Sequence, residues 1–383
     1  MPTIHWLGAG LSSGPGVQRL AAGQHPLMLW NRTLPRAQAL LEGAPATATA
    51  HTLDLDHLGR ALDPGDLVIS MLPADWHPRI AAMAIKHRAH FLSSSYISDA
   101  MRELDSAAQK AGICLLNEVG LDPGLDHLMA HRLVRRFRES DACASGSQVS
   151  LRSWCGGFPA QANAFRYKFS WSPLGVLRAL GTPARSMVAG KPVDVARPWE
   201  AITDYRIPGS NGERFEAYPN RDSLPFIEDY GFDPTWKIHD FVRGTLRLEG
   251  WAEAWSDIFE QLQSLDPADA EDRLANLSDR LWDQYAYAED EPDRVVLCVE
   301  LEAESPDGAC FHELSVIDAI GRPGSSAMAR LVSLPVSYAA DAILAGDITP
   351  GVSAAPSDKA LVDTWFGKLA ELGDVVEHRI LSR

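Results

Sequence analysis

The alternation of short apolar strands with helical stretches over the first 125 residues constrains the fold more than any other feature of the sequence. Residues 66–72, Asp-Leu-Val-Ile-Ser-Met-Leu, form an apolar run of the kind that is buried on both faces of a parallel sheet. Similar strands are expected at residues 3–8, 26–31, 89–93 and 111–117. Strands and helices that alternate at this spacing predict an α/β fold with a Rossmann-type, doubly wound parallel sheet.

The alternation ends near residue 125, and the chain of 383 residues is too long for one simple core. From there to about residue 325 the sequence contains aromatic-rich strands, punctuated by glycine and proline, and a charged helical region at 253–284. We therefore assign residues 1–125 to a dinucleotide-binding domain and residues 126–325 to an inserted α+β domain. Residues 326–383 form a C-terminal segment that begins with another helical stretch.

Charge and composition exclude several classes of protein. The chain has 35 basic and 51 acidic side chains and a formal net charge of −16, so no nucleic-acid partner is expected. No apolar run approaches the roughly 20 residues that a membrane-spanning helix requires, so no membrane association is expected. The five cysteines are widely spaced and include no Cys-x-x-Cys pair, which argues against a metal site and favours a cytoplasmic location.

A glycine-rich turn follows the first strand and leads into a helix, with the sequence Gly-Ala-Gly-Leu-Ser-Ser-Gly-Pro at residues 8–15. Gly8 permits a tight turn, and Gly10 lets the backbone approach a pyrophosphate at the helix N-terminus. Ser13 stands where the usual fingerprint has its third glycine. Such a turn can be purely structural, but its place between a strand and a helix favours nucleotide binding.

The end of the second predicted strand indicates which dinucleotide is bound. An NAD site usually carries an acidic residue there, whereas this chain has Asn31, Arg32 and Thr33. A guanidinium and a hydroxyl group can hold a 2′-phosphate, which a carboxylate would repel. The alternative is a solvated arginine at a strand end. We expect NADP as the cofactor and expect no metal.

Three further loops follow strands at the carboxyl edge of the predicted sheet, where open α/β sheets bind ligands. They are residues 70–73, 93–96 and 117–124, and we expect them to face the nicotinamide. His77, just beyond the first of these loops, is a possible acid or base, although a buried structural histidine is the more common reading of such a residue. His127 is interpreted as a structural residue at a helix start.

Several longer strings occur in one order along nearly the whole chain. The most distinctive is Asn-Glu-Val-Gly-Leu-Asp-Pro-Gly-Leu-Asp-His at residues 117–127. Others are Ser-Ser-Tyr-Ile-Ser at 94–98, Cys-Gly-Gly-Phe-Pro-Ala at 155–160, Tyr-Pro-Asn-Arg-Asp-Ser at 218–223 and Arg-Gly-Thr-Leu-Arg at 243–247. In these strings the chain resembles the saccharopine reductases, also called NADP-dependent, glutamate-forming saccharopine dehydrogenases.

The resemblance implies that the inserted domain binds the substrate and forms a homodimer, and that the C-terminal segment returns to the dinucleotide-binding domain. It also implies the reaction, in which saccharopine, NADP and water give glutamate and 2-aminoadipate 6-semialdehyde, in lysine metabolism. Two alternatives remain open: the related reductive condensation of another amine and aldehyde, as in polyamine synthesis, and a catalytically silent NADPH-binding regulator.

The chemistry of this substrate, together with the resemblance, indicates roles for particular residues. Saccharopine carries three carboxylates, and arginine matches a carboxylate bidentately, so Arg221 and Arg247 are candidates for binding this anionic amino acid. Asp122 can orient the amine or exchange a proton, or it can cap the following turn. Cys155 can line the pocket as a weak donor, or it can be a buried packing group.

From the resemblance and the substrate chemistry together, we expect the catalytic residues to be Asp122 and Cys155. The residues expected to contact the substrate are Ser95, Tyr96, Asp122, Cys155, Trp171, Arg221, Thr245 and Arg247. The residues expected to contact NADP are Gly8, Gly10, Leu11, Ser12, Ser13, Arg32, Thr33, Asp54, Leu55, Leu72, Ser94, Ser95, Asp122, Gly124 and Trp171.

Overall fold

The computed structural model describes residues 1–210, 212–266 and 268–381 and divides the chain into two compact units. The first unit comprises Met1–Leu128 and Met328–Leu369, and the second comprises Met129–Ala327 and Ala370–Arg383. The last of these segments differs from the expectation that all of 326–383 returns to the first domain. It contains strand β16 (Glu377–Ile380), which pairs with β14 (Cys310–Ile320) of the second unit because that strand offers a free sheet edge.

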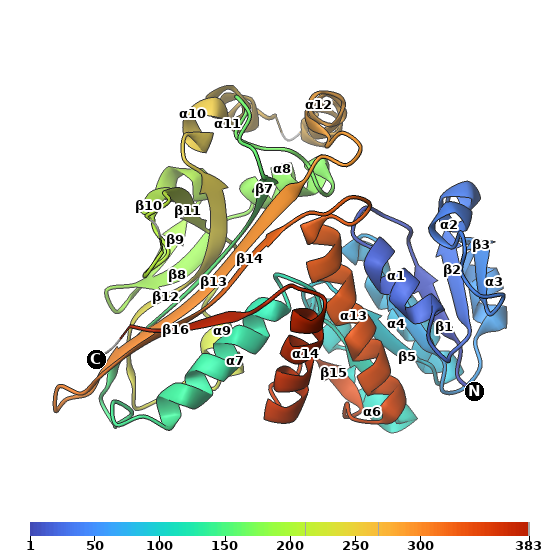
Figure 1. Ribbon diagram of the computed structural model, residues 1–383, viewed down its shortest axis with the longest axis horizontal. Helices are drawn as coiled ribbons and strands as arrows, with labels where there is room; N and C mark the ends of the chain where they lie inside the picture. The colour runs from blue at the N-terminus through green and yellow to red at the C-terminus, as the bar shows by residue number, and fades with distance from the viewer. Residues whose placement is uncertain (211, 267, 382–383) are drawn as a thin grey trace. The chain divides into compact units, whose positions relative to one another are not determined.

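The first unit is built around a seven-stranded parallel sheet with the order β15-β6-β5-β4-β1-β2-β3 (Figure 1). Its strands are β1 (Ile4–Leu7), β2 (Leu27–Asn31), β3 (Ala48–Thr52), β4 (Leu67–Ser70), β5 (His90–Ser93), β6 (Cys114–Leu116) and β15 (Gly351–Ser353). The predicted doubly wound parallel sheet is confirmed. Because β1 pairs with β2 on one side and with β4 on the other, the strand order reverses at β1, where such sheets bind ligands.

Helices cover both faces of this sheet (Figure 1). They are α1 (Gly14–Ala21), α2 (Leu34–Leu40), α3 (Leu55–Ala61), η1 (Ala74–Trp76), α4 (His77–His87), α5 (Asp99–Arg102), α6 (Asp105–Ala111), α13 (Ala327–Ala345) and α14 (Lys359–Glu371). On one face, residues of α3, α4, α5 and α6 form an apolar core with the strands. On the other, Gly16 of α1 touches α13 so closely that an added Cβ would lie 2.3 Å from the Ser333 carbonyl oxygen.

Helix α13 is also long and apolar enough to cross a membrane by length and composition alone. In its most apolar window, 78% of the residues are buried inside the protein. Ser333 of this helix accepts a hydrogen bond from the Gly16 amide through its hydroxyl oxygen, and Arg19 of α1 pairs with Asp341. This helix is therefore interpreted as part of the core of the first unit.

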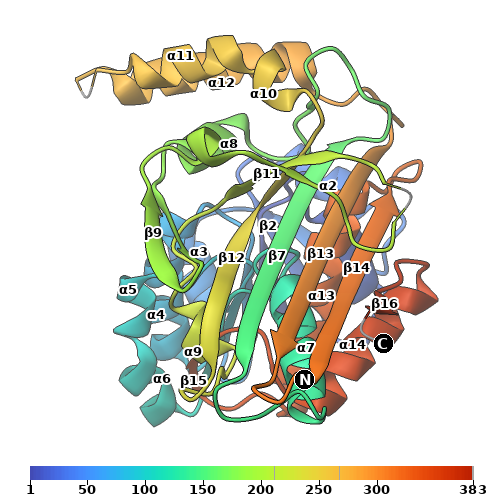
Figure 2. The ribbon, with the colours of Figure 1, turned by 90° about the vertical axis from the view of Figure 1, so that its left-hand side faces the viewer.

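The second unit contains a mixed sheet whose longest strands run side by side (Figure 2). Its strands are β7 (Gln148–Pro159), β8 (Ala184–Val188), β9 (Lys191–Val195), β10 (Thr203–Tyr205), β11 (Phe215–Pro219), β12 (Lys237–Leu248), β13 (Asp293–Glu304), β14 and β16. Its helices are α7 (Leu125–Arg138), which begins in the first unit, α8 (Pro173–Leu180), η2 (Pro198–Ala201), α9 (Phe226–Asp229), α10 (Trp251–Ala254), α11 (Ser256–Gln263) and α12 (Ala270–Tyr285). An aromatic cluster under α8, α10, α11 and α12 forms one of its cores.

Candidate functional site

The glycine-rich turn between β1 and α1 is closed tightly at one end and open at the other. Gly8 has a φ of 102°, in the region that favours glycine, and an added Cβ would lie 3.2 Å from the Met71 carbonyl oxygen. The buried Ser13 hydroxyl donates to the Gly8 carbonyl oxygen over 3.0 Å. Gly10 is exposed, and nothing lies within 4 Å of a Cβ added there. The turn therefore leaves room for a phosphate group above the start of α1.

In the usual fingerprint the third glycine allows close packing at the start of the helix, and in this chain two residues, Ser13 and Gly16, occupy this region. Ser13, which occupies that position, closes the turn through its hydroxyl group. Gly16, three residues later, provides the close helix approach, here to α13. Sequence reasoning found Ser13 but missed Gly16, because the helix that packs against it comes more than 300 residues later in the chain. Leu11 and Ser12, at the tip of the turn, are exposed and half-buried.

The segment after β2 presents a cation beside the glycine-rich turn. Asn31 connects the two, because its side-chain oxygen accepts from the Ala9 amide over 3.1 Å and its amide group donates to the Thr33 carbonyl over 2.9 Å. Arg32 is exposed and forms neither an ion pair nor a side-chain hydrogen bond with any described residue. The Thr33 side chain is also exposed. A guanidinium and a hydroxyl group are thus available to a phosphate, as the NADP prediction requires.

The other predicted contacts of the adenosine side lie nearby in the same unit. Asp54 accepts a hydrogen bond from the His57 amide over 2.6 Å, so this carboxylate caps the start of α3. Leu55 is half-buried against the core below it. The Leu53 amide donates to the Asn31 carbonyl over 3.0 Å, which holds this loop at the end of β2. Leu72, after β4, reaches within 3.5 Å of a Cβ added to Gly8.

The loops after β5 and β6 bring a tyrosine and an aspartate together. The Tyr96 hydroxyl donates to Asp122 Oδ1 over 3.0 Å. Ser94 and Ser95 are half-buried beside them, and the Ser94 hydroxyl contacts the Met71 sulfur at 3.8 Å. Gly124 has a φ of 145°, and an added Cβ would lie 2.2 Å from the Gly120 nitrogen. The loop therefore requires glycine, and Asp122 is a hydrogen-bond acceptor in it.

His77 is a buried structural residue. Its Nε2 atom donates to the Leu72 carbonyl over 3.0 Å, and its ring packs edge-on against Phe91. Burial lowers its pKa to about 4. The structural reading that the sequence left open for this histidine fits these contacts.

Acidification is expected to destabilise the protein through His77. The unfolded chain binds a proton near the ordinary pKa of 6.5 and the folded chain only near 4, so the unfolded state holds more protons between these values. Stability should rise with pH across this window, and about 3 kcal/mol should be lost from pH 6.5 to pH 4. In His77→Gln, which keeps a donor for Leu72, urea unfolding should show a shallower pH dependence; an unchanged slope would contradict this assignment.

In the second unit, three predicted substrate residues lie on adjoining strands. Cys155 of β7 is paired with Thr245 of β12, and Thr245 is paired with Tyr218 of β11. Arg247 lies two residues further along β12 and therefore projects from the same face of the sheet as Thr245. The Cys155 side chain is half-buried. The strand register thus brings Cys155, Thr245 and Arg247 together.

Arg247 is a buried cation that forms no ion pair with any residue described in this unit. Its side chain is 7% exposed, and its guanidinium lies 4.9 Å from the ring centre of Tyr167, 5.5 Å from Tyr218 and 5.3 Å from Trp251. Its Nε atom is buried with no hydrogen-bond partner among the described residues. The neighbouring carboxylate, Glu216, instead accepts from the backbone amides of residues 250 and 252.

A buried guanidinium without a carboxylate beside it is only partly compensated for its loss of hydration. Aromatic faces offset part of the desolvation of a cation, but a buried charge normally has a paired anion. A carboxylate from a ligand would supply this missing partner and would accept hydrogen bonds from the guanidinium. Sequence reasoning identified Arg247 but missed the three rings, two of which, Tyr167 and Tyr218, come from distant segments of the chain.

Of the remaining two predicted residues, Trp171 interacts with Tyr167, one of the rings around Arg247, whereas Arg221 lies apart from this row. Trp171 is 40% exposed, and its ring packs over Gly175 at the start of α8. Arg221 is exposed and follows the end of β11, with a φ of 57°. Its backbone carbonyl accepts from the Arg185 amide over 2.8 Å, while the preceding residue pairs with Arg243 rather than with Arg247. Their roles toward a ligand stay predictions.

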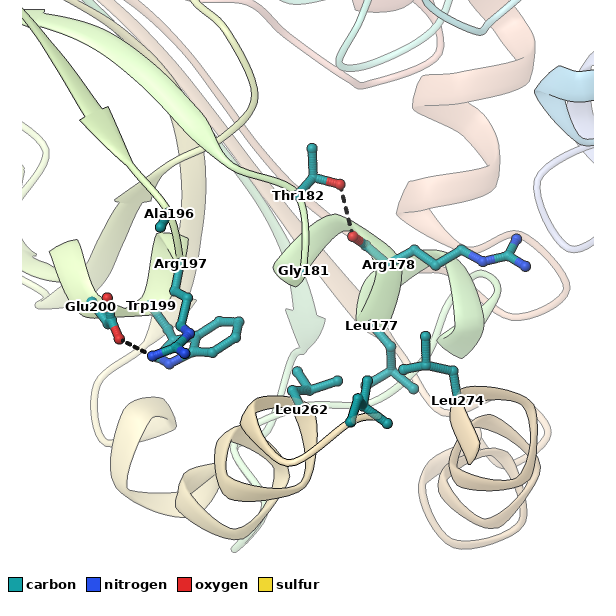
Figure 3. A pocket seen from close by; sticks show the side chains of 11 residues that line it. Leu177, Arg178, Gly181, Thr182, Ala196, Arg197, Trp199, Glu200, Leu262 and Leu274 are labelled. Carbon is teal, nitrogen blue, oxygen red and sulfur yellow. Dashed lines mark hydrogen bonds and ion pairs between the residues drawn. The ribbon is translucent and has the colours of Figure 1, made fainter. Parts of the chain in front are cut away.

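A cavity of about 730 Å³ lies elsewhere in the second unit, between α8, η2, α11 and α12 (Figure 3). Its floor is apolar, with Leu177, Leu262 and Leu274 converging on it. The arginines at its edge are paired, Arg197 with Glu200 over 2.9 Å and Arg178 with Glu271. None of the predicted site residues lines this cavity, so it is not the candidate site.

Comparison with known proteins identifies the family of this chain. The family model of the saccharopine dehydrogenase NADP binding domain matches residues 4–116, and that of the saccharopine dehydrogenase C-terminal domain matches residues 120–374. Saccharopine dehydrogenase [NADP(+), L-glutamate-forming] of Schizosaccharomyces pombe is 30% identical, with all of both chains covered. The enzyme of the same name from Saccharomyces cerevisiae is 32% identical over 91% of this chain and 92% of its own.

Solved structures give the same result. Apo saccharopine dehydrogenase (L-Glu forming) from Saccharomyces cerevisiae superposes with a TM-score of 0.82 at 29% identity, and the match covers all of both chains. A homospermidine synthase from Legionella pneumophila has a TM-score of 0.66 at 11% identity, covering 99% of this chain and 91% of its own, so it shares the fold. The chain belongs to the saccharopine dehydrogenase family.

Proposed function

We propose that this protein is an NADP-dependent oxidoreductase that acts on the CH–NH bond of saccharopine. Saccharopine, NADP and water would give glutamate and 2-aminoadipate 6-semialdehyde, and the reverse reaction would be a reductive condensation, in lysine metabolism. The observation that carries this proposal is Arg247, a buried guanidinium that lacks an anionic partner among the described residues. The names of relatives covered over their full length support the same reaction.

The residues at the carboxyl edge of the first sheet fit NADP. The open space above Gly10 suits a pyrophosphate, and Arg32 with Thr33 offers a cation and a hydroxyl group to a 2′-phosphate. When bound, NADP supplies the hydride acceptor, so the protein has to orient the substrate and manage protons and charge. Residues 94–96 and Asp122 lie on the loops after β5 and β6 and would face the reacting end of the cofactor.

The protein side chains account for the remaining chemistry of the reaction. Arg247 would hold one substrate carboxylate through charge-assisted hydrogen bonds, each contributing about 1.5–3 kcal/mol. Asp122, as a carboxylate that already accepts from Tyr96, would orient the substrate amine and take up a proton as water adds to the oxidised carbon. Cys155, beside Thr245, would line the same side of the substrate as a weak donor.

We further propose that the protein is a cytoplasmic homodimer that binds neither membranes nor nucleic acids. All five cysteines are free thiols, which suits a reducing compartment, and the acidic net charge disfavours nucleic acid. The dimer follows from the resemblance of the second unit to the dimerisation domain of the family. Light scattering of the purified protein would measure its mass in solution.

A polyamine-type condensation is the second candidate function, because the homospermidine synthase shares the fold. Polyamines carry no carboxylate and would leave the Arg247 guanidinium without an anion. This difference favours saccharopine. A catalytically silent regulator that binds only NADPH would likewise not need a buried cation to bind a substrate carboxylate.

A substrate panel tests the proposal directly. NADPH oxidation, followed by its absorbance, should be fastest with glutamate and 2-aminoadipate 6-semialdehyde, and slower when NADH replaces NADPH. The panel should include putrescine and other amines, each with several aldehydes. A clear preference for a pair without carboxylates would contradict the saccharopine assignment, and the absence of turnover with every pair would favour the regulator.

A further inference from the structure

A buried group of ionisable side chains lies under the loops that carry Tyr96 and Asp122. Glu118 follows β6 and is 4% exposed, and His127, in the first turn of α7, is 2% exposed. Glu118 Oε2 lies 2.9 Å from His127 Nε2, and His127 Nδ1 lies 3.5 Å from Asp126 Oδ2. None of these three side chains has a role in the hydride and proton transfer proposed for this protein.

Glu118 is bonded at both of its ends to the segment that carries Tyr96. Its backbone amide donates to the Ser95 carbonyl over 3.0 Å, and its Oε1 atom accepts from the Ile97 amide over 2.9 Å. The residues on either side of Tyr96 are therefore held by one residue, Ser95 by the Glu118 backbone and Ile97 by its side chain. Glu118 also has a φ of 57°, a left-handed conformation that is costly for a residue other than glycine.

The other end of the group holds the loop that carries Asp122. Asp126 Oδ1 accepts from the Gly124 amide over 2.7 Å, two residues beyond Asp122. The Leu125 amide donates to the Gly120 carbonyl over 2.9 Å, which closes the loop. The contacts therefore run from the Tyr96 segment through Glu118, His127 and Asp126 to the Asp122 loop.

We propose that Glu118 and His127 are positioning residues that hold the Tyr96 hydroxyl and the Asp122 carboxylate in hydrogen-bonding geometry for the reaction. Burying carboxylates and a histidine costs desolvation energy that an apolar pair of similar volume would avoid. The loops could be packed without charge, but apolar side chains cannot bond to the Ile97 amide. This inference rests on the proposed function only for the identity of the substrate. The geometry of the two loops does not depend on that function.

A double-mutant cycle tests the proposal. Glu118→Ala should lower kcat for saccharopine oxidation about 100-fold, because small displacements of reacting groups have effects of this size. The NADP KM should change less than about threefold. In the Tyr96→Phe background the same substitution should lower kcat less than about threefold, since the geometry that it disturbs is already lost.

Conservative and control variants separate positioning from general stability. Glu118→Gln keeps an acceptor for the Ile97 amide and should remain within about tenfold of the wild-type kcat. His127→Gln, which leaves Glu118 in place, should show an intermediate loss and replaces Glu118→Ala if the latter does not fold. Asp105→Ala is the matched control, because Asp105 ties the Val352 amide of β15 over 2.8 Å and should leave kcat unchanged.

Two readings would overturn the proposal. One is a Glu118→Ala effect that is equally large in the wild-type and Tyr96→Phe backgrounds. The other is a crystal structure of Glu118→Ala in which the Tyr96 hydroxyl stays 3.0 Å from Asp122 Oδ1. The crystallographic reading needs no turnover. A wild-type protein inactive on saccharopine would thus defeat the proposed function alone, and the geometry would still be decided.

Discussion

Replacing Arg247 by methionine is expected to lower kcat/KM for saccharopine by roughly 30- to 1,000-fold, while the NADP KM changes less than about threefold. The substrate carboxylate would lose a buried, charge-assisted partner, and losses of one member of such a pair cost about 2–4 kcal/mol. Steady-state kinetics in the direction of saccharopine oxidation would measure both constants.

The same substitution should leave the protein as stable as before, or more stable. In the described structure the guanidinium is buried among the rings of Tyr167, Tyr218 and Trp251 without an anion, and methionine of similar length removes this desolvated charge. Arg214→Met is the matched control, because Arg214 is only partly buried and pairs with Asp204 and Glu249. Unchanged kcat/KM combined with a large loss of stability would show that Arg247 is a packing residue.

Replacing Arg32 by aspartate is expected to shift cofactor preference from NADP toward NAD. The substitution removes the guanidinium and places a carboxylate, which repels a 2′-phosphate and can bind ribose hydroxyls. The kcat/KM for NADP should fall about 100-fold or more, corresponding to about 3 kcal/mol, and that for NAD should rise. Because Arg32 is exposed and forms no ion pair with a described residue, thermal stability should hardly change.

Arg60→Asp provides the control for this change of charge. Arg60 is exposed in the last turn of α3. Its replacement by aspartate reverses the charge in the same way at a different position of the same unit. If both variants weaken NADP equally, the effect is a long-range one of net charge, and Arg32 does not contact the 2′-phosphate. A pronounced salt dependence shared by the two would point the same way.

The fold class of the first unit could be predicted because it depends on the local pattern of apolar residues along the sequence. The buried strands, such as 67–70, are continuous apolar runs, and alternation with helices leaves few possible arrangements of a sheet. β3 and β15 were missed, since Ala48–Thr52 is polar and only partly buried, and Gly351–Ser353 has three residues. The strand at Glu377–Ile380 was not predicted, and its segment was assigned to the first domain, because a four-residue strand carries no signal of its partner.

By itself the sequence determined which residues stand at strand ends, because strand and turn propensities are local. It therefore indicated the glycine-rich turn, Arg32 and Asp122, whereas Arg247 was indicated by its place in a string that resembles the family. Only the tertiary structure decided how Glu118 and His127 meet beneath the loops, and that three aromatic rings surround Arg247. Tyr167 and Tyr218 reach Arg247 from distant segments of the chain, and even the nearby pairs Glu118 with His127 and Arg247 with Trp251 depend on how the backbone turns. Whether a charged side chain is paired, surrounded by rings or solvated therefore depends on neighbours that only folding supplies.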